Sequence, residues 1–134
     1  MDLLKVSDDE IALLTGVDDL AQSARLLVDR GIRCVAVTIS SEGALLATRE
    51  GTVMVPGFPT RPVDTTGAGD SFWGGFLTCV SESGKPLSAL TMSDFQRFAR
   101  FGNAVASLCV EKRGAIPAMP ARQEVLARMG NTDL

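Results

Sequence analysis

The segment that most limits how this chain can fold is a short glycine-containing run that leads straight into an apolar helix. It reads Asp64-Thr65-Thr66-Gly67-Ala68-Gly69-Asp70 and is followed by Ser71-Phe72-Trp73-Gly74-Gly75-Phe76-Leu77. Two glycines around an alanine let successive backbone N–H groups converge, and the first turn of the helix adds unpaired donors and a partial positive charge. The segment therefore predicts a binding site for an anion such as a phosphate group.

Asp70 lies inside this predicted anion site, where its own negative charge would repel a phosphate. A carboxylate in this position is better suited to act as a base on an incoming hydroxyl group. The sequence has no histidine, which excludes Ser-His-Asp and Cys-His nucleophilic schemes and histidine-bound metals. A dinucleotide-binding fingerprint would need glycine at Phe72, and the Gly-Lys-Ser/Thr sequence of a P-loop is absent. Phosphoryl transfer is the function that this motif favours, and a tight glycine turn with a capping aspartate is the alternative.

Composition favours one small domain that binds a small molecule. The 134 residues predict a single domain over 1–134, with 46% hydrophobic residues and a net charge of -3. The mixed charges predict no nucleic-acid or membrane partner, and the short apolar runs and acidic N-terminus predict a cytoplasmic protein without a membrane span. Cys34, Cys79 and Cys109 stand far apart in apolar segments, which favours buried reduced thiols over disulfides or a zinc site.

The hydrophobic pattern alternates between strand and helix periods, which predicts an α/β fold. Strands are expected at 3–6, 34–39, 44–48 and 52–55, and helices at about 8–14, 18–30, 68–82, 87–91, 93–110 and 121–129. The continuous β-favouring run at 34–39 is typical of a strand that is covered on both faces. Among the basic residues, Lys85, Arg97, Arg100 and Arg122 are expected to be solvated.

The chain resembles the C-terminal half of ribokinase-like carbohydrate kinases of the PfkB type, and it resembles their fructokinase branch most closely. Five segments match in order: 5–16, 37–47, 63–75, 101–104 and 114–120. The resemblance implies a three-layer αβα, Rossmann-like fold in which this chain is the nucleotide-binding part. The family's chains are more than twice as long, and their N-terminal half supplies the first strands of the sheet, the lid and most sugar contacts.

The resemblance also implies catalytic and nucleotide-binding roles for individual residues. Asp70 would deprotonate a primary hydroxyl of the sugar, and the amides of Gly67, Ala68 and Gly69 would form the anion hole for the transferred phosphoryl group. Thr38 and Gly43 match a Thr-x-Gly-x-x-Gly turn that holds nucleotide phosphates, with Ser40 in place of the middle glycine. Asn103 and Gly114 match residues that line the adenine pocket.

Two metal sites follow from the same resemblance. Glu10 matches the acid of an Asn-x-x-Glu motif that organises magnesium through water, with Ser7 in place of the asparagine. By spacing alone, Ser7 and Glu10 also form a helix-capping pair, and the two roles can coexist. Asp64, Thr66 and Gly114 match parts of a monovalent-cation site in some relatives. The implied cofactors are therefore ATP and Mg²⁺, with K⁺ as an open question.

The implied function is ATP-dependent phosphorylation of a primary hydroxyl of a sugar, with fructose as the first candidate. One alternative is a kinase of another sugar or sugar acid, such as 2-keto-3-deoxygluconate. The other is a truncated fragment that binds nucleotide, or only associates with another chain, without catalysis. A sheet cut in this way should expose an edge strand and apolar faces, so the chain is expected to need a complementary N-terminal half or an oligomer.

Overall fold

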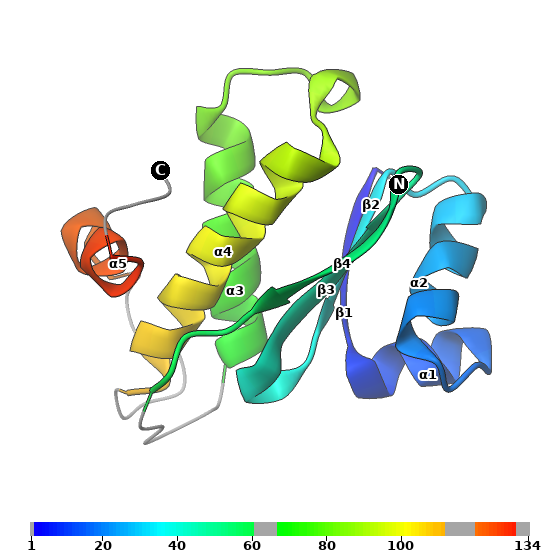
Figure 1. Cartoon of the computed structure of the whole chain (residues 1–134), viewed down its shortest axis with the longest axis horizontal. Helices are drawn as coiled ribbons and strands as arrows, with labels where there is room; N and C mark the ends of the chain where they lie inside the picture. Colours follow the sequence, from blue (N-terminus) through cyan, green and yellow to red (C-terminus); the bar gives the residue numbers. More distant parts are fainter. Residues whose placement is uncertain (1, 61–66, 112–119, 131–134) are drawn as a thin grey trace.

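Over the residues that the structure describes, the chain forms a four-stranded mixed sheet with helices on both faces (Figure 1). The computed structural model describes residues 2–60, 67–111 and 120–130. The strands are β1 (Leu3–Ser7), β2 (Cys34–Thr38), β3 (Gly43–Thr48) and β4 (Gly51–Pro56). The helices are α1 (Asp8–Thr15), α2 (Leu20–Asp29), α3 (Ala68–Glu82), α4 (Met92–Cys109) and α5 (Arg122–Arg128), with short 3-10 turns at Ser40–Glu42 and Leu87–Ala89.

The strands lie in chain order across the sheet, and only the first pair is parallel. β1 runs parallel to β2, which places Lys5 beside Ala36 and Ser7 beside Thr38. β2 with β3 and β3 with β4 are antiparallel pairs. In the described part of the chain, β1 and β4 are therefore the two edge strands.

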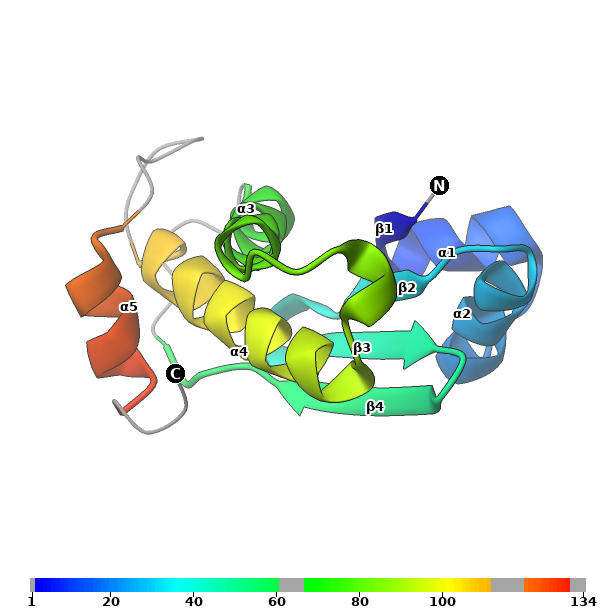
Figure 2. The same ribbon diagram turned by 90° about the horizontal axis from the view of Figure 1, so that it is seen from above.

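Helices cover the two faces of the sheet in two separate layers. α1 and α2 lie on one face, whereas α3 and α4 lie on the other, with α5 packed beyond α4 (Figures 1 and 2). β2 alternates between the two cores, because Cys34 and Ala36 face α3 and α4 while Val35 and Val37 face α1 and α2. This arrangement is the three-layer αβα architecture that the sequence predicts, and the buried strand at its centre explains the continuous apolar run.

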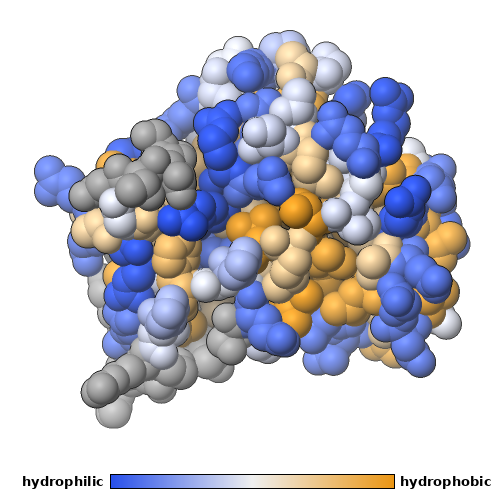
Figure 3. Space-filling model, in the orientation of Figure 1, coloured by the Kyte–Doolittle hydropathy of each residue, from blue (hydrophilic) through white to orange (hydrophobic). Residues whose placement is uncertain are grey.

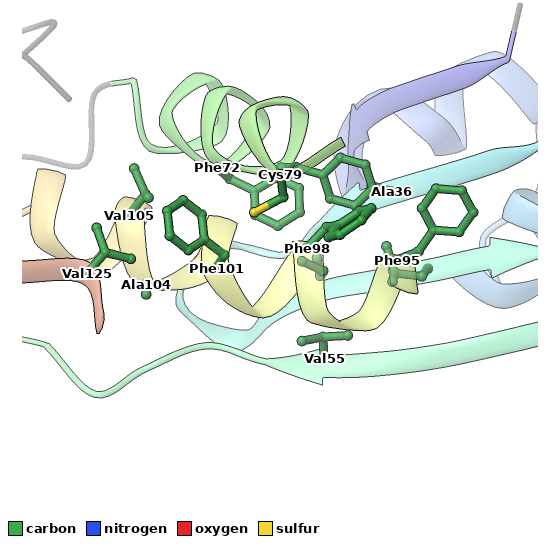
Figure 4. Packing of buried hydrophobic residues seen from close by; sticks show 14 of the residues in the cluster. Ala36, Val55, Phe72, Cys79, Phe95, Phe98, Phe101, Ala104, Val105 and Val125 are labelled. Carbon is green, nitrogen blue, oxygen red and sulfur yellow. The ribbon is translucent and has the colours of Figure 1, made fainter. Parts of the chain in front are cut away.

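The larger core is rich in aromatic side chains from α3 and α4 (Figure 4). Phe76 stacks on Phe95 with ring centroids 6.0 Å apart and meets Phe98 edge-on at 6.0 Å. The two helices approach closely at Gly102, where a Cβ atom would lie 2.6 Å from the backbone oxygen of Phe72. Close packing of α3 on α4 helps to fix the position at which α3 begins. The start of α3 is the predicted anion site.

The helix boundaries follow capping chemistry. Ser7 and Glu10 form a reciprocal capping box at the start of α1, and Gly16 ends that helix in the left-handed conformation, with φ 71°. Asp19 caps α2 by accepting from the Gln22 amide, so this helix begins at Leu20, two residues later than the hydrophobic pattern suggests. None of the helices in the described ranges is long and apolar enough to cross a membrane.

Three of the four basic side chains that were expected to be solvated, Lys85, Arg97 and Arg122, are exposed, whereas Arg100 is partly buried. Each of the four also has a partner. Lys85 and Arg97 both contact the carboxylate of Asp94, with N–O distances of 3.5 and 2.5 Å. Asp94 is buried while it caps α4, and a buried carboxylate is stable only when it is paired. Arg122 pairs with Glu82, and Arg100 donates to the Met129 carbonyl at 2.9 Å.

Candidate functional site

The predicted anion site forms the N-terminus of α3. Gly67 is the residue before the helix, and its φ of 79° is a left-handed conformation that glycine adopts without strain. Glycine brings no side chain to cap the helix, so the N–H groups of the first turn lack the usual side-chain acceptor. These N–H groups, together with the helix dipole, form a positively polarised end that suits an anion. We call Gly67, Ala68 and Gly69 the glycine cradle.

Asp70 lies in the first turn of α3, directly after the glycine cradle. Its side chain is 89% exposed, and its Oδ1 atom lies 3.6 Å from the Nζ atom of Lys5 on β1. A carboxylate with this exposure is open to a substrate hydroxyl. The structure therefore brings one acidic and one basic side chain together beside the cradle.

A cavity of about 840 Å³ lies between the start of α3, the ends of β1 and β2, and the segment that follows β4. It brings together six of the predicted site residues: Thr38, Ser40, Gly43, Ala68, Gly69 and Asn103. Gly67, Asp70 and Glu10 do not line this cavity. Asp64, Thr66 and Gly114 lie outside the described residues.

The turn after β2 is held in an unusual backbone conformation. Gly43 has a φ of 115°, and a Cβ atom there would lie 2.1 Å from the Val55 carbonyl oxygen, so only glycine fits. Ser40 has a φ of 44°, the sole positive value at a non-glycine residue in the described part of the chain. Thr38 lies at the start of this turn, and its hydroxyl is 3.9 Å from the position that a Cβ on Gly69 would occupy. The turn and the glycine cradle therefore face the same space.

Asn103 is 6% exposed and connects α4 to the end of β4. Its Nδ2 atom donates to the carbonyl oxygens of Val55 and Pro56 at 3.0 and 3.1 Å. These hydrogen bonds explain why a poor helix former is found in the middle of α4. They also position the wall of the cavity that Asn103 lines.

Glu10 serves the helix cap that its spacing predicts. Its Oε1 atom accepts the Ser7 amide at 2.9 Å, and the Ser7 hydroxyl accepts the Glu10 amide at 3.2 Å. The hydrogen bond from the Ser7 backbone is the main reason that the pKa of Glu10 is lowered, which favours the charged form of this carboxylate. Asp8 and Asp9 line the cavity beside it. No group of three or more potential metal ligands occurs within 2–60, 67–111 and 120–130. A water-mediated Mg²⁺ fits this donor set, because Mg²⁺ keeps several waters and takes few protein carboxylates.

Lys5 is a residue of this site that the sequence motifs did not predict. Its side chain is 20% exposed, and its Nζ atom is 3.4 Å from the position of a Cβ on Gly69. The available signal was a lysine inside the apolar run Leu3-Leu4-Lys5-Val6. That signal gives no information about which distant segment the lysine meets.

A second polar group that the motifs did not predict borders the cavity near the end of α4. Thr60 donates to the Ser107 carbonyl at 3.1 Å and to Glu111 at 2.5 Å, and Arg128 of α5 donates to Glu111 at 2.8 Å. The hydrogen bonds from Arg128 and then Thr60 lower the pKa of Glu111. This group joins α5 and the segment after β4 to the end of α4.

Comparisons with known proteins agree on one family. The family model described as pfkB family carbohydrate kinase matches residues 1–122. Ribokinase of Haemophilus influenzae is 32% identical over 131 residues, covering 94% of this chain and 40% of that protein. Fructokinase-2 of Oryza sativa subsp. japonica is 36% identical over 135 residues, covering 97% of this chain and 39% of that protein. The chain thus spans about 40% of the length of these relatives.

Solved structures share the fold over nearly the whole chain. Fructokinase from Vibrio cholerae, in its fructose, ADP and calcium ion bound form, matches with a TM-score of 0.84 at 31% identity, over 94% of this chain and 40% of that one. Ribokinase from Thermotoga maritima matches with a TM-score of 0.81 at 32% identity, over 98% and 43%. These matches show that the described sheet and helices are part of a ribokinase-like fold. The chain belongs to the pfkB family of carbohydrate kinases.

Proposed function

We propose that this chain, over residues 1–134, is the nucleotide-binding C-terminal part of an ATP-dependent sugar kinase. It supplies the ATP site, the anion hole and the catalytic base for transfer of a phosphoryl group to a primary hydroxyl. The observation that carries this proposal is the placement of an exposed carboxylate, Asp70, directly after the glycine cradle. The cavity that gathers Thr38, Gly43 and Asn103 adjoins this position.

In the proposed reaction Asp70 accepts the proton of the sugar hydroxyl as that oxygen attacks the terminal phosphorus of ATP. The amides of the glycine cradle hold the charge that spreads over the transferred phosphoryl oxygens. A positioned base contributes a factor of about 10² to 10⁴ in rate. Loss of one anion-hole donor costs about 2.7 to 4 kcal/mol of transition-state stabilisation. Both groups therefore contribute several kcal/mol to the proposed transfer.

The remaining site residues bind the nucleotide and metals in this proposal. Thr38, Ser40 and Gly43 hold nucleotide phosphates, and Asn103 and Gly114 line the adenine pocket. Glu10 holds Mg²⁺ through water, and Mg²⁺ neutralises phosphate charge when it is bound. Asp64, Thr66 and Gly114 hold a monovalent cation. A Vibrio cholerae fructokinase double mutant, 30% identical to this chain, was solved in a fructose, ADP and potassium ion bound form, which supports the choice of nucleotide and K⁺.

Fructose is the first candidate substrate, because several fructokinases match this chain at 33 to 37% identity. Ribose is the second, because the Haemophilus influenzae ribokinase matches at 32%. A cytoplasmic location, where thiols stay reduced, fits the three buried free cysteines, Cys34, Cys79 and Cys109.

The test is ADP release from MgATP by the purified chain, with fructose, ribose and sugar acids as acceptors. We expect sugar-dependent turnover, and we expect Asp70→Asn to lower it by a factor of about 10² to 10⁴, because the amide cannot accept the proton. Asp29→Asn is the matched control, since Asp29 is exposed at the far end of α2 and should leave turnover unchanged. Turnover that survives in Asp70→Asn would refute the assignment of the base. If the chain alone is inactive, the same comparison is made after the complementary N-terminal half is added.

A further inference from the structure

Lys5 is the one lysine of the described residues whose ammonium group reaches the glycine cradle. It lies on β1 beside Ala36, whose side chain belongs to the core under α3 and α4. The side chain is 20% exposed, and its Nζ atom lies 3.6 Å from Asp70 Oδ1. The same atom is 3.4 Å from the position of a Cβ on Gly69. The ammonium group therefore lies close to both Asp70 and Gly69, at the wall of the cavity.

This position is electrostatically unusual for a cation. The N-terminus of α3 carries a partial positive charge, which repels an ammonium group. Asp70 attracts it, but a carboxylate that is 89% exposed is well solvated, and such a pair contributes little stability. Two positive features, the Lys5 ammonium and the start of α3, thus face one point beside a single solvated acid. An anion at that point would contact both.

We propose that Lys5 is a catalytic residue whose ammonium group binds the oxygens of the terminal phosphoryl group of ATP. This inference rests on the proposed function. In the transfer, the bond from the sugar oxygen to the terminal phosphorus forms and the bond from that phosphorus to the bridging oxygen of ADP breaks. The hydroxyl proton moves to Asp70, and the electron pair of the broken bond leaves with ADP. Lys5 keeps its proton throughout and neutralises the charge on the moving group.

The location of Lys5 also predicts which nucleotide it distinguishes. The terminal phosphoryl group has to pass within reach of the base, because the attacked phosphorus and the hydroxyl meet there. A cation 3.6 Å from the base carboxylate therefore contacts the terminal phosphoryl group rather than the phosphates that remain in ADP. Lys5 should contribute to the binding of ATP and contribute little to the binding of ADP.

The test measures binding of a non-hydrolysable ATP analogue and of ADP, each with Mg²⁺, by isothermal titration calorimetry. We expect Lys5→Met to weaken binding of the ATP analogue by about 10- to 100-fold, as for loss of a charge-assisted hydrogen bond. Binding of ADP should change by less than about threefold. Lys85→Met is the matched control, because Lys85 is half exposed and contacts Asp94 away from the cradle, and both affinities should stay unchanged. Lys5→Arg keeps the charge and should retain most of the preference for the ATP analogue.

Repeating the measurement in an Asp70→Asn protein distinguishes a role of Lys5 in nucleotide binding from simple pairing with Asp70. If Lys5 only neutralises Asp70, Lys5→Met should have no effect in an Asp70→Asn protein. We expect the loss of affinity for the ATP analogue to persist in that background. Equal weakening of both nucleotides, or no weakening, would overturn the role of Lys5 while the proposed function stands. A wild-type chain that binds neither nucleotide would overturn the proposed function and the role of Lys5 with it. Lys5→Gln serves as the test variant if circular dichroism shows that Lys5→Met is unfolded.

Discussion

Ser40 occupies a backbone conformation that suits glycine better than serine. Its φ of 44° lies in the left-handed region, which costs free energy for a residue with a Cβ atom. The residue begins the 3-10 turn between β2 and β3, and that turn lines the cavity. The Thr-x-Gly-x-x-Gly motif that this segment resembles has glycine at this position, and the positive φ gives a physical reason for that glycine. Serine adopts the same turn with some backbone strain.

We predict that Ser40→Gly changes the free energy of unfolding by less than about 1 kcal/mol, because relief of strain offsets the greater freedom of glycine in the unfolded chain. Ser40→Val should instead destabilise the fold by about 1 to 3 kcal/mol, because a β-branched side chain is strained at positive φ. Urea denaturation followed by circular dichroism measures both values. Equal stability of the valine and glycine variants would show that the turn relaxes to another conformation.

The start of α3 depends on how that helix packs against α4. Gly102 of α4 faces Phe72 of α3, where a Cβ atom would lie 2.6 Å from the Phe72 oxygen and 2.9 Å from its Cδ1 atom. Gly75 of α3 meets the same region, since a Cβ there would lie 3.1 Å from the Gly102 Cα atom. Absence of side chains at these two positions lets the two helices approach each other closely.

We predict that Gly102→Ala lowers the free energy of unfolding by about 1 to 3 kcal/mol, because the added methyl group overpacks the helix contact. In an open helix the same change would raise stability by about 0.8 to 1 kcal/mol, so the sign of the effect identifies its cause. Thermal and urea unfolding provide the measurement. A more stable Gly102→Ala protein would show that the two helices separate without cost.

The sequence was sufficient for the elements but not for every contact of the site. Periodicity, the Ser7 and Glu10 cap and the stop at Gly16 predicted the order of strands and helices, because these signals depend on neighbouring residues. Family motifs placed Thr38, Gly43 and Asn103 at one cavity. The contact of Lys5 with Asp70, and the partners of Lys85 and Arg97 at Asp94, were not predictable, because they join distant segments through the packing of whole elements.

At the scale of the whole molecule, the described residues leave apolar side chains exposed and two strand edges unpaired. Leu13 and Leu14 of α1 are 87% and 60% exposed, and Met54 on the edge strand β4 is 41% exposed. Figure 3 shows hydrophobic residues gathered near the middle of the face on which β4 lies nearest the viewer. Unpaired strand edges and exposed apolar side chains both favour association with another chain.

We predict that the purified chain self-associates at micromolar concentration, and that replacing Leu13 and Leu14 together with glutamate shifts it toward the monomer. Covering the exposed leucines with a second chain would bury apolar surface and so stabilise the associated form, and glutamate at these positions removes that gain. The monomer should stay folded, because the buried residue of α1, Ile11, is unchanged. Size-exclusion chromatography with light scattering gives the mass of each species. A wild-type chain that is monomeric across the concentration range would contradict this prediction.

Lys5 belongs to β1, and β1 is an edge strand in the described part of the chain. An edge strand frays more readily than a strand that is paired on both sides, so any segment that pairs with the outer edge of β1 also restricts the motion of Lys5. Restricting Lys5 lowers the entropy cost of binding a phosphate beside it, and a bound phosphate in turn restricts β1. By thermodynamic linkage each event strengthens the other by the same factor. If Lys5 binds a phosphate as proposed, nucleotide binding and pairing at the outer edge of β1 are therefore coupled equilibria.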